Sequence, residues 1–347
     1  MPAGPAGRPA TIYDVAALAN LSIATVSRVL QGTGPVSERA RMRVVQAARE
    51  LNYVPLRAAR SLAVQRHEAH GLVLPDLAGP FYADLLMGYE RWAGEHGQSV
   101  VITITRDRAD DADRGLRDLA GRVDGIVVHG NAVGLEAVRD LRRAQVPVVL
   151  VAHAPVAGCD SVRSESSGSA ERLTGRLLDH GRRRLLFIGD PASSYDVSER
   201  YAGFSAAHRT RGLPFPEPGR VPLTEDAGAT VAERWLGATD RADGLVCAND
   251  ELALAAMAVL RRAGVDVPGE VVVTGWDDVM AARYVTPGLT TVRQPMAELG
   301  RLAAQRLHER ITGERTRARN DVLGTQIVLR DSCGTAPGDP AAPSKTG

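Results

Sequence analysis

Seven short apolar runs between residues 71 and 274 constrain the fold of this chain more than any other feature. The runs are separated by stretches with helical spacing, and they are Gly71–Leu74, Val100–Ile104, Gly125–Val128, Val146–Val151, Leu185–Ile188, Gly244–Cys247 and Val271–Thr274. Nearly continuous runs, in contrast to alternating ones, are typical of parallel strands that are buried on both faces. About 270 residues with this pattern are too many for one sheet. They therefore predict an α/β body of two doubly wound parallel-sheet lobes.

The residues before this body carry a different charge. Residues 1–66 contain nine arginines and three acids, a net charge of +6, and because the whole chain carries +1 the remainder carries −5. A basic head on a mildly acidic body indicates that the head binds a polyanion. Charge alone is equally compatible with a solvated basic face.

Helix-capping residues recur within the basic head. Thr11, followed three residues later by Asp14, predicts the start of a short helix that ends at Asn20, a residue that tolerates the left-handed conformation. Ser22 and Ser37 predict the starts of a second and a third helix. Two short helices joined by a tight turn and braced by a third are typical of an all-α helix-turn-helix module. The alternative is a small amphipathic bundle that only packs.

In a helix-turn-helix module the second helix enters the major groove, here over residues 23–30. Arg28 then suits bidentate reading of guanine, while Ile23 and Ala24 suit thymine methyl groups. The hydroxyl side chains nearby suit phosphates. The DNA contacts that we expect from the head are Thr11, Ser22, Ile23, Ala24, Thr25, Ser27 and Arg28.

The head resembles that of the lactose-repressor (LacI/GalR) family over about 55 residues. The segments that carry the resemblance are Thr11-Ile-Tyr-Asp-Val-Ala16, Thr25-Val-Ser-Arg-Val-Leu30, Val36-Ser-Glu38 and Leu51-Asn-Tyr-Val-Pro55. The resemblance implies that the next segment is a hinge that becomes helical on operator DNA, with Arg57 and Ala59 at the DNA and Leu62 as a minor-groove wedge. Leu56 departs from the family, which usually has Asn there, and ordinary packing is the alternative role of Leu62.

The residues that follow the apolar runs are informative because open parallel sheets bind ligands beyond the carboxyl ends of their strands. The candidates there are Phe81, Tyr82, Arg200, Asn249 and Asp277. Rings and charged groups of this kind suit a sugar-like ligand, and interlobe hydrogen bonds are the alternative for the polar ones. Asp250 is either a further polar group at this edge or the N-cap of a helix over residues 251–260.

The body, over residues 70–330, resembles the effector domain of the same family, which is similar to periplasmic sugar-binding proteins. The resemblance implies that these five candidates bind the effector. Two departures count against an ordinary hexose: Ala152-His153 stand where the family often has Asp, and Leu223 stands at a position that is sometimes aromatic. His153 replaces the lost polar contact or is structural. A nucleoside or purine effector, or a pocket that no longer binds any ligand, are the alternatives.

The predicted organisation divides the chain as follows. The boundaries that we expect are a disordered N-terminus (1–10), a helix-turn-helix domain (11–54), a hinge helix (55–68), an effector-binding and dimerisation domain (69–330) and a disordered tail (331–347). Within the body we expect lobe 1 over 69–162 and 293–323, and lobe 2 over 163–292 and 324–330.

The sequence also argues against several classes of protein. It has no GxGxxG after the first strand, no Walker loop, no GxSxG and no HExxH, so we expect no enzyme, no cofactor and no metal. Three scattered cysteines and the lack of a long apolar run favour a cytoplasmic, nucleoid-associated protein and no membrane partner. The function that we expect is that of a sequence-specific transcriptional regulator, a repressor, which binds a palindromic operator as a homodimer under control of an effector that either induces or corepresses.

Overall fold

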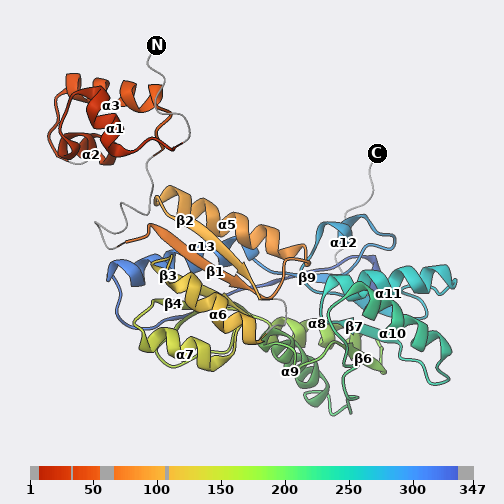
Figure 1. The fold of residues 1–347 in the computed structure, drawn as a ribbon. Coiled ribbons are helices and arrows are strands. Elements are labelled where there is room, and N and C mark those ends of the chain that lie inside the picture. Colours follow the sequence, from red (N-terminus) through yellow and green to blue (C-terminus); the bar gives the residue numbers. More distant parts are fainter. Residues whose placement is uncertain (1–7, 33, 55–65, 106–108, 335–347) are drawn as a thin grey trace. The chain divides into compact units, whose positions relative to one another are not determined.

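The computed structural model describes residues 8–32, 34–54, 66–105 and 109–334, without the side chains of Gln31 and of residues 109–113. The chain divides into two compact units, Met1–His67 and Glu68–Gly347, which we call the head and the body (Figure 1).

The head consists of three helices, α1 (Ile12–Ala19), α2 (Ile23–Gln31) and α3 (Glu38–Glu50). They enclose one small core, because each helix buries a narrow apolar stripe against the other two. The buried side chains of this core are Val15, Ala16, Ala19, Val26, Val29, Val44 and Ala47.

The predicted caps of the three helices are confirmed. The Thr11 hydroxyl donates to Asp14 Oδ2 at 2.7 Å and the Thr11 amide donates to the same oxygen at 2.8 Å, which completes a capping box. Asn20 ends α1 in the left-handed conformation, with φ at 46°. Ser22 and Ser37 cap α2 and α3 through their hydroxyl oxygens. The short turn between α1 and α2 is therefore fixed by local hydrogen bonds.

Lobe 1 of the body is built on a six-stranded parallel sheet with the order β10-β5-β4-β3-β1-β2. Its strands are β1 (Ala69–Leu74), β2 (Ser99–Ile104), β3 (Gly125–His129), β4 (Val148–Val151), β5 (Asp160–Ser164) and β10 (Asn320–Leu323). The inner strands β1, β3 and β4 are buried along their whole length, as their continuous apolar sequences predict.

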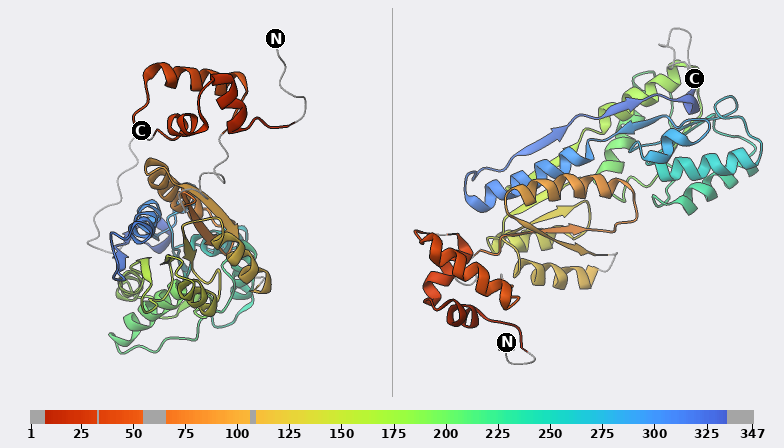
Figure 2. Two further views of the ribbon diagram at one scale, coloured as in Figure 1. Left: turned by 60° about the vertical axis from the view of Figure 1, so that its left-hand side comes forward. Right: turned by 90° about the horizontal axis from the view of Figure 1, so that it is seen from above.

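Helices cover both faces of this sheet. Helices α5 (Phe81–Glu95) and α13 (Met296–Thr312) lie side by side on one face, and Figure 2 shows the pair from above. Helices α6 (Ala109–Ala120) and α7 (Leu135–Arg143) contribute to the separate apolar cluster on the other face. Alternate residues of each strand therefore enter different clusters, as a doubly wound sheet requires.

Two glycines let α5 and α13 cross closely. A Cβ atom at Gly88 would lie 1.9 Å from the Ala297 carbonyl oxygen, and one at Gly300 would lie 2.0 Å from the Leu85 carbonyl oxygen. Neither position admits a side chain without moving a helix backbone. This contact holds α5 in place, and the first turn of α5 carries Phe81 and Tyr82.

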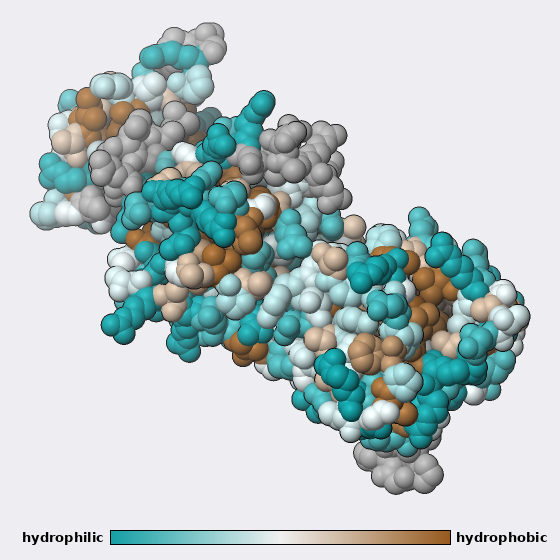
Figure 3. All heavy atoms as spheres, turned by 90° about the horizontal axis from the view of Figure 1, so that it is seen from below, coloured by the Kyte–Doolittle hydropathy of each residue, from teal (hydrophilic) through white to brown (hydrophobic). Residues whose placement is uncertain are grey.

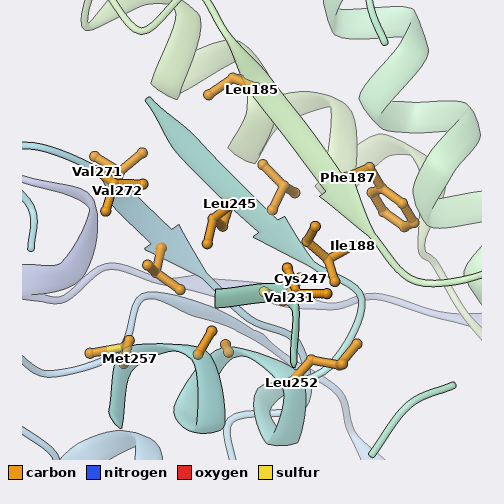
Figure 4. Close-up of a cluster of buried hydrophobic side chains, with 14 of the residues drawn as sticks. Leu185, Phe187, Ile188, Val231, Leu245, Cys247, Leu252, Met257, Val271 and Val272 are labelled. Atoms are coloured by element: carbon orange, nitrogen blue, oxygen red, sulfur yellow. The ribbon is translucent and has the colours of Figure 1, made fainter. Parts of the chain in front are cut away.

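Lobe 2 has a smaller parallel sheet with the order β6-β7-β8. Its elements are β6 (Leu185–Ile188), β7 (Gly244–Cys247) and β8 (Val272–Thr274), with α8 (Ser167–Asp179), α9 (Tyr195–Arg209), α10 (Glu225–Gly237) and α11 (Asp250–Arg262). The helices pack in two pairs, α8 with α9 and α10 with α11. Figure 4 shows the apolar core in which side chains from the strands meet Leu252 and Met257 of α11.

Short elements connect the two lobes. Strand β9 (Thr291–Arg293) pairs antiparallel with β11 (Gln326–Val328), and α12 (Met280–Tyr284) lies between β8 and β9 in the sequence. Strand β9 leads directly into α13 of lobe 1. The chain thus passes from lobe 2 to lobe 1 through the segment 289–295.

Two predicted boundaries differ from the structure. Residues 331–334 do not belong to a disordered tail, because a 3-10 helix (Asp331–Cys333) packs on lobe 2 and Ser332 Oγ donates to the Val273 carbonyl at 2.6 Å. The Pro- and Gly-rich composition that follows Arg330 concealed this packing. Of the predicted hinge helix, residues 66–68 are not helical and residues 55–65 lie outside the described residues.

Candidate functional site

The solvent-facing side of α2 carries the side chains that were predicted to contact DNA. Ser22, Ile23, Ala24 and Arg28 are exposed, and Ile23 retains 42% of its surface in solvent. Thr25 and Ser27 are partly exposed. The opposite side of the helix holds Val26 and Val29 in the core. The helix therefore separates packing residues from residues that are available to a partner.

Local hydrogen bonds organise this surface. Ser22 Oγ lies 2.9 Å from Thr25 Oγ1, and Arg28 Nε donates to the Ala24 carbonyl at 3.3 Å. Both interactions lie on the exposed side, so the side chains hold an orientation before any partner binds. The Thr11 hydroxyl differs from these, because it donates to Asp14 and holds the start of α1. Of the predicted contacts, Arg57, Ala59 and Leu62 lie outside the described residues.

Tyr13 and Leu18 belong to the exposed surface of the head and were not among the predicted contacts. Tyr13 is 67% exposed and lines a shallow depression with Ser22 and Ile23. Leu18 is also exposed, because α1 buries only Val15 and two alanines. In the sequence, the signal that could have identified Tyr13 is an aromatic residue in the helix that precedes the predicted reading helix.

In the body, residues from both lobes converge at the carboxyl ends of the strands. We call this group the interlobe cluster, and it consists of Phe81, Tyr82, His129, Arg200, Asn249, Trp276 and Asp277. On the lobe 1 side the rings of Phe81 and Tyr82 have centroids 4.1 Å apart, and the His129 ring lies 5.4 Å from Tyr82. His129 ends β3 and is buried, so burial lowers its pKa to about 4 and keeps the ring neutral at pH 7.

Electrostatic interactions link Tyr82 to lobe 2. Burial raises the pKa of the Tyr82 hydroxyl, and the carboxylates of Asp76, Asp277 and Glu251 raise it further. Asp76 follows β1 of lobe 1, whereas Asp277 and Glu251 follow β8 and β7 of lobe 2. The phenol therefore stays protonated and can donate a hydrogen bond between the lobes.

Arg200 occupies the lobe 2 side of the cluster. Only 5% of its surface is exposed, and Nη1 donates to the Ala248 carbonyl at 2.6 Å. Its guanidinium lies over the Trp276 ring, 4.7 Å from the centroid, and 4.0 Å from Asp196. A buried cation held by a ring and a carboxylate keeps a fixed direction, which suits recognition of a polar ligand.

Asp277 faces Arg200 from the loop after β8. Burial raises its pKa to about 6, although Arg200 and a 2.6 Å hydrogen bond from Gln294 Nε2 both act to lower it. Its backbone has φ at 114°, a conformation that L side chains rarely adopt. Such strain at a buried carboxylate is frequent at ligand sites.

Asn249 has a structural role in this structure. Its Oδ1 accepts from the Leu252 amide at 3.0 Å, so Asn249 and not Asp250 is the N-cap of α11. Its Nδ2 donates to the Leu223 carbonyl at 3.3 Å. Asp250 is buried and accepts from Thr291 Oγ1 and the Val279 amide, which fixes the loop that carries Asp277. The N-cap alternative for Asp250 was wrong.

His153 stands apart from the interlobe cluster. Its Nδ1 lies 2.7 Å from the Ala154 carbonyl oxygen, next to Ala152 in the left-handed conformation. No interaction among the described residues joins it to Phe81 or Asp277. The structural reading of His153 is therefore the better supported one.

The interlobe cluster contains buried polar atoms with no hydrogen-bond partner among the described residues. These atoms are His129 Nδ1, Arg200 Nε and Trp276 Nε1. Buried donors are rarely left unpaired in native proteins, so these atoms indicate a ligand or water that completes them. His129 and Trp276 were missed in the sequence, although each directly ends or follows a predicted strand. Within the described ranges no group of acidic, His and Cys side chains is arranged to hold a metal.

Comparisons with known proteins agree with this arrangement. Residues 11–55 match the model of the bacterial regulatory proteins of the lacI family, and residues 174–333 match a periplasmic binding protein-like domain. The ribose operon repressor of Escherichia coli (strain K12) is 33% identical over 87% of this chain and 93% of its own length.

Two solved structures are similar over nearly the whole chain. A complex of the transcriptional regulator CelR with cellobiose shares 32% identity over 93% of this chain and 99% of its own, with a TM-score of 0.71. The lac repressor dimer bound to operator and the anti-inducer ONPF shares 25% identity over 94% of this chain and 100% of its own, with a TM-score of 0.86. These proteins are regulators and not enzymes. None of the helices that the structure describes is long and apolar enough to cross a membrane. With its helix-turn-helix head and two-lobed α/β body, the chain belongs to the LacI family of bacterial regulatory proteins and is a DNA-binding transcriptional regulator.

Proposed function

We propose that this regulator is a homodimeric repressor of a palindromic operator and that a small carbohydrate-like effector binds at the interlobe cluster. The observation that carries the proposal is that two buried donors of the interlobe cluster, on Arg200 and Trp276, have no hydrogen-bond partner among the described residues. Arg200 Nε and Trp276 Nε1 supply donors, and Asp277 supplies an acceptor. A polyol offers both kinds of partner on every hydroxyl group.

The aromatic residues favour a sugar over a purely charged ligand. Phe81 and Tyr82 offer ring faces, and sugar rings present apolar C–H faces together with polar edges. The carboxylate of Asp277 accepts hydrogen bonds from hydroxyls, and the fixed guanidinium of Arg200 donates to them. The relative described as a CelR–cellobiose complex supports this class of effector.

The head supports sequence-specific reading of DNA. Arg28 is exposed on α2, so it can reach a guanine edge, while Ile23 and Ala24 present apolar surface suited to a thymine methyl group. The hinge residues Arg57, Ala59 and Leu62 complete the proposed contacts, with Leu62 inserted at a central base step. We place the regulator on the nucleoid DNA of the cytoplasm.

Exposed apolar side chains of the body support a homodimer. Met87 on α5 and Met280 and Tyr284 on α12 all point to solvent, and Tyr284 retains 78% of its surface. These side chains are the dimer contacts that we propose, because exposed apolar patches often mark surfaces that another protein covers. In a dimer the two heads address half-sites about one helical turn apart, so a ligand that shifts the lobes changes operator affinity.

A thermal-shift screen tests the effector proposal. The full chain is heated with mono- and disaccharides, and with nucleosides and purines as the competing class. We expect a sugar to raise the melting temperature, by an amount that grows with its concentration. Arg200→Ala should lose this shift and Arg262→Ala, an exposed arginine on α11, should keep it. A shift with purines alone would contradict the carbohydrate proposal.

A further inference from the structure

Lobe 2 contains a cavity that shares no lining residue with the interlobe cluster. It has a volume of about 700 Å³ and lies beside β6, α10 and the segment 214–221. Sites for small organic ligands typically measure about 300–1,000 Å³. Size alone therefore admits a ligand of moderate length.

The cavity exists because β6 is an edge strand. On its outer side the segment 214–221 pairs with it only at Gly219, whose amide donates to the Phe187 carbonyl at 2.8 Å. The segment then departs from the strand and leaves space between itself and α10. The rings of Phe215 and Trp235 are among the side chains that line this space.

The floor of the cavity is apolar. Leu185, Ile188, Val231 and Leu245 line it, and Figure 4 shows these four side chains together in the lobe 2 core. The Trp235 indole donates to the Ala242 carbonyl at 2.8 Å, so its ring presents carbon atoms to the cavity with no unmet donor. Seen from below, the body shows brown apolar surface bordered by teal side chains at lobe 2 (Figure 3). The floor thus suits a hydrocarbon and not a sugar.

The rim is strongly cationic. Five arginines line the cavity, and Asp240 is the single acid among the lining residues. The arginines are Arg183, Arg184, Arg220, Arg234 and Arg241. A positive rim around an apolar floor is complementary to a molecule with an apolar body and one negative end.

The five arginines differ in the hydrogen bonds and ion pairs that they already form within the protein. Arg184 pairs with Asp240 at 2.6 Å, and Arg220 pairs with Asp190 at 2.8 Å. Arg241 donates to the carbonyls that end α10 and lies over the Trp235 ring. Arg234 is exposed and forms no hydrogen bond or ion pair with the described residues. Arg183 donates to the Leu178 carbonyl at 2.6 Å, so Arg234 is the rim charge that is available for a ligand.

We propose that this cavity is a second ligand site, which binds a small amphipathic anion: an aliphatic chain that lies along the edge of β6 and carries an anionic headgroup at Arg234. The site is independent of the carbohydrate proposal, because it uses no residue of the interlobe cluster. It gives the regulator a place to bind a metabolite of an unrelated chemical class.

Isothermal titration of the full-length protein with two probes tests the preference for an anionic headgroup and for a hydrocarbon tail together. Decanoate and decylammonium have the same hydrocarbon tail and opposite headgroups. We expect one decanoate to bind per chain, at least about tenfold more tightly than decylammonium. Equal binding of the two probes, or no binding of decanoate, would overturn the proposal.

Three variants locate the site. Arg234→Glu should lower the affinity for decanoate about tenfold. Arg262 is an exposed arginine of the same lobe outside the cavity, so Arg262→Glu should change this affinity less than about twofold. Ala238→Trp places a large ring at an exposed position of the cavity wall and should abolish binding. Equal effects of the two charge reversals would refute the site. Arg200→Ala should bind decanoate normally, so a failed sugar screen leaves this test intact.

Discussion

The head and the body present their candidate recognition residues in opposite ways. In the head, Ile23 and Arg28 project from a small bundle into solvent, whereas in the body Tyr82 and Arg200 are 6% and 5% exposed. DNA is a large, preformed surface, so a protein reads it with projecting side chains. A small molecule offers few contacts, and it is held by groups that are already desolvated and directed. The difference predicts that substitutions in the two regions separate two activities cleanly.

The largest effect should come from the head core. Val26 is fully buried, and Val26→Asp places an unpaired charge among three short helices, which costs several kcal/mol and unfolds the head. We expect operator binding in gel shifts to fall below detection, while the body melts as before and still binds its effector. Val45→Asp on the exposed side of α3 is the matched control and should leave the head folded. Loss of effector binding in Val26→Asp would show that the two units do not fold independently.

The next largest effect should be a loss of effector binding in the body without a change in operator binding by the head. Arg200→Ala removes a buried guanidinium. The loss of a charged hydrogen bond, worth up to about 3 kcal/mol, should lower the affinity for the effector about 100-fold. Operator affinity without effector should stay unchanged. Arg200→Lys keeps the charge but not the planar group, so titration calorimetry should show a smaller loss. An unchanged affinity in both variants would remove Arg200 from the site.

A smaller effect is expected for base reading. Arg28→Ala should lower affinity for the preferred operator by about 2 kcal/mol, or about 30-fold, and relax the preference at one base pair in each half-site. Selection of sites from a random pool measures this directly. As a control, Arg41→Ala removes an exposed positive charge from α3 and should weaken the binding of all DNA sequences alike. A selected consensus that matches the parent protein would contradict the role of Arg28.

The smallest effect is a dependence on pH in the body. Burial raises the pKa of Asp277 to about 6, so below that pH the carboxylate gains a proton and accepts fewer hydrogen bonds. Effector affinity should fall by up to about tenfold per pH unit below 6. Stability moves the other way, because a raised folded-state pKa favours the folded state at low pH, and this contribution is lost as pH rises from 3.8 to about 6. Asp277→Asn should flatten both profiles, and persistent slopes would assign them to another group.

The sequence predicted those parts of the fold that depend on local chemistry. The caps at Thr11, Ser22 and Ser37 depend on residues three positions away, and each was found from the sequence alone. The apolar runs also predicted seven strands, because burial on both faces leaves a continuous apolar signature. Strand β5 has the polar sequence Asp160-Ser-Val-Arg-Ser164 and was missed, since ion pairs to Arg310 and Arg315 replace apolar packing at Asp160.

The site was predicted in outline and not in its contacts. Phe81, Arg200 and Asp277 come from three separate elements, and the rule that strand ends share one edge was enough to group them. The rule did not show that Trp276 lies under Arg200 or that Gln294 binds Asp277, because those contacts depend on how loops bend. The capping role of Asn249 was missed for a simpler reason: Asp250 beside it is an equally good N-cap by type.

Operator binding in the presence of a bound sugar tests whether the interlobe cluster controls the head. Fluorescence anisotropy would give the operator affinity of the full chain with and without a saturating sugar found in the screen. We expect the sugar to change the operator affinity about fivefold or more, in either direction, and to leave it unchanged in Arg200→Ala. An operator affinity that stays the same while the sugar is bound would contradict this expectation.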